Sequence, residues 1–104
     1  MPEFATPFSV KKSDRKLTPK ELIRSIRFMV SAEYEAVQLY EELAESTDNT
    51  LAQNVLLDIA EEEKVHAGEF FRLLHELAPV EQDLYDAGAK EVEEEFLSPH
   101  KEKK

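Results

Sequence analysis

Two long helical patterns joined by a short turn constrain this chain more than any other feature. Apolar residues recur at spacings of three and four over 22–44 and again over 52–77, which predicts one apolar face on each of two helices. The letters TPKE at 18–21 form a capping box with a first-turn proline, so the first helix begins there. The turn-forming letters STDNT at 46–50 end it, and Pro79 ends the second helix. Two helices of about 28 residues therefore fold back as an antiparallel hairpin about 40 Å long.

Two helices cannot enclose a core, so the hairpin must bury its apolar surface against another subunit. We predict an all-α protein whose hairpin dimerises into a four-helix bundle, with a short C-terminal helix in addition. The expected organisation is an N-terminal arm at 1–17, a helical hairpin at 18–78, a C-terminal helical segment at 79–97 interrupted near Gly88, and a flexible tail at 98–104.

Both apolar stripes contain acidic residues. On the first helix the stripe is Leu22, Ile26, Met29, Glu33, Ala36, Val37, Tyr40 and Ala44. On the second helix it is Ala52, Val55, Ile59, Glu63, His66, Phe70, Leu73, Leu74 and Leu77. At about 100° per residue, Glu33 lies near the middle of its stripe, and Glu63 and His66 lie on either side of theirs.

Neighbouring residues fall outside these stripes. Glu62 lies at the margin of the second stripe, and Glu61 points away from it. Five apolar residues also lie off the stripes and widen the apolar surface: Phe28, Leu39, Ala60, Ala67 and Phe71. We expect them to contact the arm, the C-terminal segment or a neighbouring dimer.

A carboxylate that faces a core must be protonated, paired or bound to a metal, because burying it alone costs several kcal/mol. No Lys or Arg in either stripe is positioned to pair with Glu33 or Glu63. The i, i+3 spacing of Glu63 and His66 brings both side chains to one side of the helix, where they can bind one ion.

Charge and cysteine content limit the function classes. The formal net charge of −10 argues against a partner with a phosphate backbone and against an anionic membrane surface. The chain has no cysteine, which excludes thiolate metal centres. No segment has the roughly 20 apolar residues of a membrane span, so we expect a cytoplasmic protein. A metal would be held by carboxylate and imidazole, which suit iron, manganese or zinc.

Half of a di-iron ligand set is present. A four-helix di-iron carboxylate site takes one Glu from each of two helices and a Glu-x-x-His pair from each of the other two. This chain supplies Glu33 once, and Glu63 with His66 once. A two-fold symmetric homodimer would supply the complete set for two ions at its interface.

The segments SAEYEAVQLYEEL at 31–43 and LLDIAEEEKVHAGEFFRLL at 56–74 resemble those of the encapsulated ferritin-like proteins, relatives of rubrerythrin and ferritin. The resemblance covers about residues 18–78. It implies a two-helix protomer, a ferroxidase centre between two protomers, a ring of several dimers, and iron storage inside an encapsulin shell.

The resemblance also assigns residues. The iron ligands of the family correspond to Glu33, Glu63 and His66, and a tyrosine beside the centre corresponds to Tyr40. Of the acidic residues that form a metal-uptake site in the family, Glu35 matches one, whereas Ala32 replaces another.

We therefore expect a ferroxidase that oxidises Fe²⁺ to Fe³⁺ with O₂ or H₂O₂, with catalytic residues Glu33, Glu63, His66 and Tyr40. Its expected partners are a second copy of itself and an encapsulin shell protein, with no nucleic acid and no membrane. The alternatives are a non-catalytic helical dimerisation module with protonated glutamates, a zinc- or manganese-stabilised assembly without turnover, and rubrerythrin-like peroxide reduction.

Overall fold

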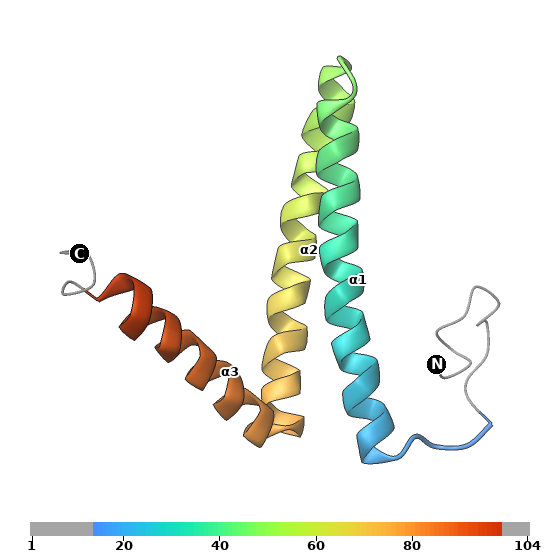
Figure 1. The fold of residues 1–104 in the computed structure, drawn as a ribbon. Coiled ribbons are helices and arrows are strands. Elements are labelled where there is room, and N and C mark those ends of the chain that lie inside the picture. The colour runs from blue at the N-terminus through green and yellow to red at the C-terminus, as the bar shows by residue number, and fades with distance from the viewer. Residues whose placement is uncertain (1–13, 99–104) are drawn as a thin grey trace.

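The computed structural model describes residues 14–98, which form helices and connecting turns only (Figure 1). The elements are α1 (Pro19–Glu45), α2 (Thr50–Leu77), α3 (Pro79–Val92) and a π-helical turn, η2 (Glu93–Leu97). The all-helical prediction is confirmed. Most of the predicted arm and tail lies outside the described residues. Within the described part of the chain, none of the helices combines the length and the apolar character needed to cross a bilayer.

Local capping signals define where the two long helices begin. The Glu21 amide donates to Thr18 Oγ1 (3.2 Å), and the Thr18 amide donates to Glu21 Oε1 (2.9 Å), which completes the capping box. Arg15 holds the Glu21 carboxylate in a bidentate pair at 2.7 and 2.6 Å. Asn49 caps α2 by accepting from the Ala52 amide at 2.9 Å. The predicted helix starts are therefore confirmed.

The core of the protomer is one seam between α1 and α2, which run antiparallel along their full length (Figure 1). Its buried apolar side chains recur at intervals of four or seven residues, as in a coiled coil. They are Ile26, Val30, Val37 and Ala44 from α1, with Ala60, Ala67 and Leu74 from α2.

The prediction that Ala60 and Ala67 lie off the main stripe is wrong. They are 2% and 5% exposed, whereas the predicted stripe residues Val55 and Leu73 are 48% and 42% exposed. Small side chains allow the two backbones to approach closely, so the seam follows the alanines and the bulkier residues remain beside it.

The hairpin leaves a second apolar face uncovered. Large apolar side chains next to the seam are exposed: Leu22, Leu43, Val55 and Leu73. None of the described side chains is fully buried. As the sequence indicated, a single protomer does not enclose a core.

The predicted interruption at Gly88 does not occur. α3 continues from Pro79 to Val92, and no glycine among the described residues has a positive φ. A helical glycine costs about 1 kcal/mol relative to alanine, and Gly88 stands between two alanines, which are strong helix formers. The irregular part is the π-helical turn after Val92. α3 diverges from the hairpin and has no buried residue (Figure 1).

Candidate metal centre

Glu33 lies midway along α1 on the side that faces α2. Its side chain is 16% exposed, which agrees with the prediction that it faces the core. Val30 and Val37, one turn before and one turn after it, are buried in the seam. The helix therefore fixes the carboxylate among apolar neighbours.

Glu63 and His66 meet Glu33 from α2. His66 Nδ1 is 3.7 Å from Glu33 Oε2 and 3.7 Å from Glu63 Oε2. One ligand atom from each of the three side chains lies within 4.8 Å of the others. The Glu63 side chain is 19% exposed and His66 is 47% exposed, so the cluster opens to one side of the hairpin.

The electrostatics of the cluster are unfavourable without a cation. Glu33 Oε2 is buried and has no hydrogen-bond partner among the described residues. The nearby Glu63 carboxyl, to which a protonated Glu33 would donate a hydrogen bond, raises the pKa of Glu33, and the loss of surrounding water and repulsion between the two carboxylates raise it further. His66 opposes this shift only in part. A bound cation would relieve both the repulsion and the unpaired oxygen.

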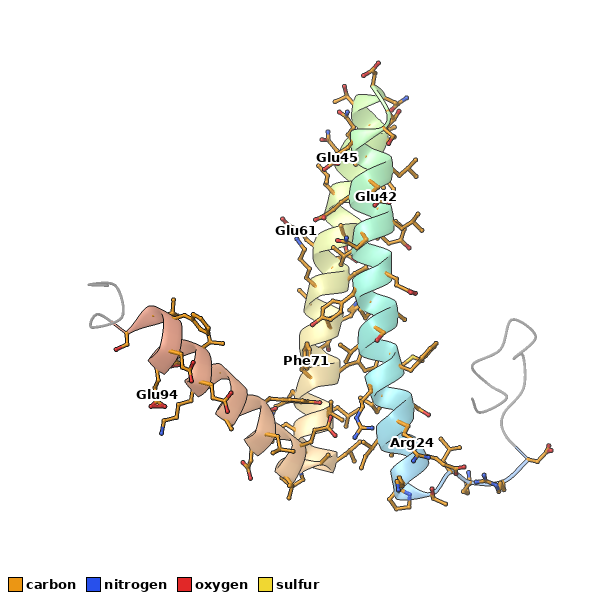
Figure 2. The ribbon with its side chains drawn as sticks, viewed as in Figure 1. Arg24, Glu42, Glu45, Glu61, Phe71 and Glu94 are labelled. Atoms are coloured by element: carbon orange, nitrogen blue, oxygen red, sulfur yellow. The ribbon has the colours of Figure 1, made fainter. Side chains whose placement is uncertain are left out.

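The cluster thus contains three of the four predicted site residues. Tyr40 is half-buried two turns further along α1, and no hydrogen bond joins it to the cluster within residues 14–98. Glu35, Glu61 and Glu62 are exposed, and none of them belongs to the three-residue group. Figure 2 labels Glu61, which points away from the hairpin.

Sequence reasoning missed the residues that bring the two helices together at the cluster. Ala60 and Ala67 flank Glu63 on the buried side of α2 and permit the short distance to Glu33. Lys64, the residue after Glu63, pairs across the seam with Glu41 at 3.3 Å. The seven-residue interval between the alanines was the available signal, since it matches the interval between Val30 and Val37.

A model of the Rubrerythrin family matches residues 26–103. The chain belongs to the rubrerythrin family. Among solved structures, this rubrerythrin-family chain is similar to the crystal structure of an encapsulated ferritin domain from Pyrococcus furiosus, with a TM-score of 0.81 and 33% identity. That match covers 90% of this chain and 96% of the other. The predicted resemblance to encapsulated ferritin-like proteins is therefore confirmed.

Two curated proteins are also similar to this rubrerythrin-family chain. A ferritin-like–encapsulin shell fusion protein of Pyrococcus furiosus is 38% identical over 81 residues, covering 78% of this chain and 24% of that protein. The encapsulin nanocompartment cargo protein EncC of Myxococcus xanthus is 39% identical over 82 residues, covering 79% of this chain and 60% of that protein. The chain spans less than two thirds of the length of either relative.

Proposed function

We propose that two copies of this chain form a ferroxidase centre, in which Fe²⁺ is the substrate and Glu33, Glu63 and His66 of both copies are the ligands. The observation that carries the proposal is the cluster itself. Three ligand side chains from two helices converge within 4.8 Å, and one of their oxygens is buried without a partner. Two carboxylates and one imidazole are a donor set that suits iron.

A second copy explains why the cluster is open. Two ions need more donors than one protomer provides, and a four-helix di-iron site takes four carboxylates and two imidazoles. The exposed apolar side chains beside the seam, such as Leu43, Val55 and Leu73, would be covered by the same face of the partner. A two-fold dimer would then bury His66 and complete both ligand sets.

The protein groups have distinct tasks in this chemistry. Each of two Fe²⁺ ions gives up one electron, and O₂ takes up both electrons with two protons to leave H₂O₂. Carboxylates offset the positive charge that grows as the ions are oxidised, and Glu63 is the candidate to bridge ions about 3.5–4 Å apart. Because the pKa of Glu33 is raised in the metal-free protein, metal binding would displace any proton held there. We assign Tyr40 to a supporting position next to the centre.

We also propose that the oxidised iron is stored inside an encapsulin nanocompartment. The support comes from the two curated relatives, since one carries an encapsulin shell in the same chain and the other is a nanocompartment cargo protein. A compartment that encloses the centre would retain the Fe³⁺ product.

The test is Fe²⁺ oxidation under controlled oxygen. Anaerobic Fe²⁺ is added to the protein, oxygen is admitted, and the near-ultraviolet absorbance of Fe³⁺ is followed against a protein-free control. Wild type should oxidise Fe²⁺ fast, whereas Glu33→Ala and His66→Ala should fall to the buffer rate. The matched control is Glu61→Ala, which removes an exposed carboxylate two residues from Glu63 and should keep the wild-type rate.

Equal rates in wild type and in both ligand variants would overturn the proposal. Metal-dependent dimerisation without Fe²⁺ consumption would instead support a structural zinc or manganese assembly. Dimerisation that does not change when metal is added would support the non-catalytic dimerisation module.

A further inference from the structure

A single basic residue lies in the part of the hairpin that carries the cluster. Residues 28–71 contain eleven acidic residues and one Lys or Arg, which is Lys64. Lys64 directly follows the proposed ligand Glu63, where its positive charge opposes the approach of Fe²⁺. Its ammonium pairs with Glu41 of α1, with Nζ 3.3 Å from Oε2. Glu41 therefore offsets this repulsion and ties Lys64 to the other helix.

This ion pair is the one link between permanently charged side chains of α1 and α2 in residues 14–98. The other ion pair across the hairpin joins His66 to Glu33, inside the cluster. The remaining Lys and Arg pairs of the described residues lie at the start of α1, within α2, or between α1 and α3. The Lys64 side chain is 58% exposed, and an ion pair this exposed adds little to stability. Its position matters more than its strength.

The ion pair and the metal cluster lie on opposite sides of the seam. Around α1, Glu33, the buried Val37 and Glu41 follow one another at steps of about 40°. Around α2, about 100° separates Lys64 from Glu63, with the buried seam between them. The cluster is therefore open on one side of the seam, and the ion pair bridges the helices on the other.

The ion pair also runs diagonally along the hairpin. Lys64 lies at the level of the cluster, whereas Glu41 lies eight residues, or about 12 Å, beyond Glu33 toward the turn. Side chains on a helix tilt toward its N-terminus, so in this antiparallel pair Lys64 leans toward the turn and Glu41 leans away from it. The two side chains meet between their levels. Their contact therefore resists both rotation of α2 and sliding of α2 along α1.

Packing is sparse on this side of the seam. Lys64 lines an open pocket with Tyr34, Gln38, Gly68 and Phe71. A Cβ atom on Gly68 would meet nothing within 4 Å. The centroids of the Tyr34 and Phe71 rings are 6.3 Å apart. Apolar contacts here therefore oppose rotation of α2 only weakly, which leaves the ion pair as the main restraint.

We propose that Glu41 and Lys64 form a brace that positions the ligands of the metal cluster, an inference that rests on the proposed ferroxidase function. Metal bound on the open side draws Glu33 and Glu63 together, and the brace restrains the helices on the other side. A rotation of α2 by about 10° moves a ligand atom about 5 Å from the helix axis by about 0.9 Å. A misplacement of this size can lower a rate by about 100-fold. Glu41 and Lys64 lie outside the ligand group, so both are positioning residues.

The experiment removes each charge separately and measures kcat and KM for Fe²⁺ oxidation. If the two charges acted only on approaching Fe²⁺, Lys64→Gln should raise kcat/KM and Glu41→Gln should lower it. The brace instead predicts that both variants lose at least about tenfold in kcat, since either change breaks the same contact. Glu41→Asp keeps the charge but shortens the reach, and it should lower kcat as well.

Reversal of the pair provides the rescue. Glu41→Lys with Lys64→Glu keeps the net charge and the combined length of the two side chains, so it should recover most of the kcat that either single reversal loses. The matched controls are Glu42→Gln, which changes the exposed neighbour of Glu41 (Figure 2), and Arg72→Gln, whose ion pair stays within α2. Both controls should keep the wild-type kcat.

Co²⁺ provides a readout that does not depend on oxidation. Its visible absorption bands report the geometry of the ligands, so they should change in Glu41→Gln and Lys64→Gln and return in the reversed pair. Far-ultraviolet circular dichroism should give equal helix content in all variants, since neither residue is buried. Rates and spectra are compared at a protein concentration at which every variant has the mass of wild type.

Wild-type kcat in either Gln variant, effects of opposite sign on kcat/KM, or no recovery in the reversed pair would overturn the brace. A wild type that binds Co²⁺ but does not oxidise Fe²⁺ would overturn the ferroxidase proposal, and the Co²⁺ spectra would still decide the brace. A wild type that does neither would overturn both proposals.

Discussion

Replacing Glu33 by methionine should stabilise the metal-free protein and abolish its stabilisation by metal. One oxygen of Glu33 is buried without a partner, and such an acceptor costs about 1–3 kcal/mol. Methionine has a similar length, has no carboxylate and adapts to irregular space. A change of 1 kcal/mol shifts Tm by about 4–8 °C in a domain of this size. Removing this cost should raise the free energy of unfolding by at least about 1 kcal/mol. In chelator, the Tm of Glu33→Met should therefore lie at least about 4 °C above that of wild type.

When a redox-silent metal is added, wild type should have the higher Tm and Glu33→Met the lower one. Wild type with Mn²⁺ or Zn²⁺ at about 100 times its Kd should gain about 2.7 kcal/mol, whereas Glu33→Met should gain little. Thermal melts followed by circular dichroism, at one fixed protein concentration, measure both effects. The control Glu42→Met changes an exposed glutamate on the same helix and should stay within about 0.5 kcal/mol of wild type.

A Glu33→Met variant that melts below wild type in chelator would refute this reasoning. The Glu33 carboxyl would then stabilise the metal-free fold instead of destabilising it. Equal metal stabilisation of wild type and variant would remove Glu33 from the ligand set.

Three further outcomes are expected. Thr18→Ala removes the N-cap that accepts from the Glu21 amide and should cost about 1 kcal/mol in urea unfolding; an unchanged urea midpoint would contradict this. Ala67→Leu overfills the seam and should cost about 1–3 kcal/mol by the same measurement; an unchanged urea midpoint would contradict close packing at this position. The Arg27 guanidinium, followed by the Tyr85 hydroxyl, lowers the pKa of Glu81 from 4.5 to about 2. The stability from this carboxylate is therefore complete above pH 4.5 and is lost as pH falls toward 2. Wild type should exceed Glu81→Gln in stability at neutral pH, and a difference that persists at pH 2 would exclude this origin.

The helix boundaries could be predicted because their signals are local. The capping box at Thr18, the turn ending at Asn49 and the break at Pro79 each act within a few residues of where they occur. Gly88 was misjudged because glycine weakens a helix by an amount that two neighbouring alanines can offset. The π-helical turn after Val92 has no comparable local signal.

The seam was harder to predict, because burial depends on which face the other helix covers. The helical spacing of apolar residues placed Val55 and Leu73, which remain exposed, on the stripe, and it placed Ala60 and Ala67, which are buried, outside it. Close approach of two backbones needs small side chains, so the narrowest residues lie in the centre of the contact.

The cluster of Glu33, Glu63 and His66 could largely be predicted, since two of its distances follow from simple geometry. Helix periodicity alone brings Glu63 and His66 together. In an antiparallel hairpin, residues equally far from the turn lie at one level, and Glu33 and Glu63 are almost equally far from the turn at 46–49. Helix periodicity places Tyr40 on the same side of α1 as Glu33 but about 10 Å further along the axis, so it predicts no direct contact between them.

Under the proposed function, the open side of the cluster would couple metal binding to dimerisation. His66 is 47% exposed, and one protomer offers only three ligand side chains. If a partner supplies the other three, metal binding favours the dimer and the dimer favours metal binding by the same free energy. Repulsion between Glu33 and Glu63 weakens the metal-free dimer further, because two such pairs would face one another across the axis. Under the proposed function, the assembled chain would therefore bind its reactive ions more tightly than a lone protomer, and iron oxidation would be favoured in the assembly.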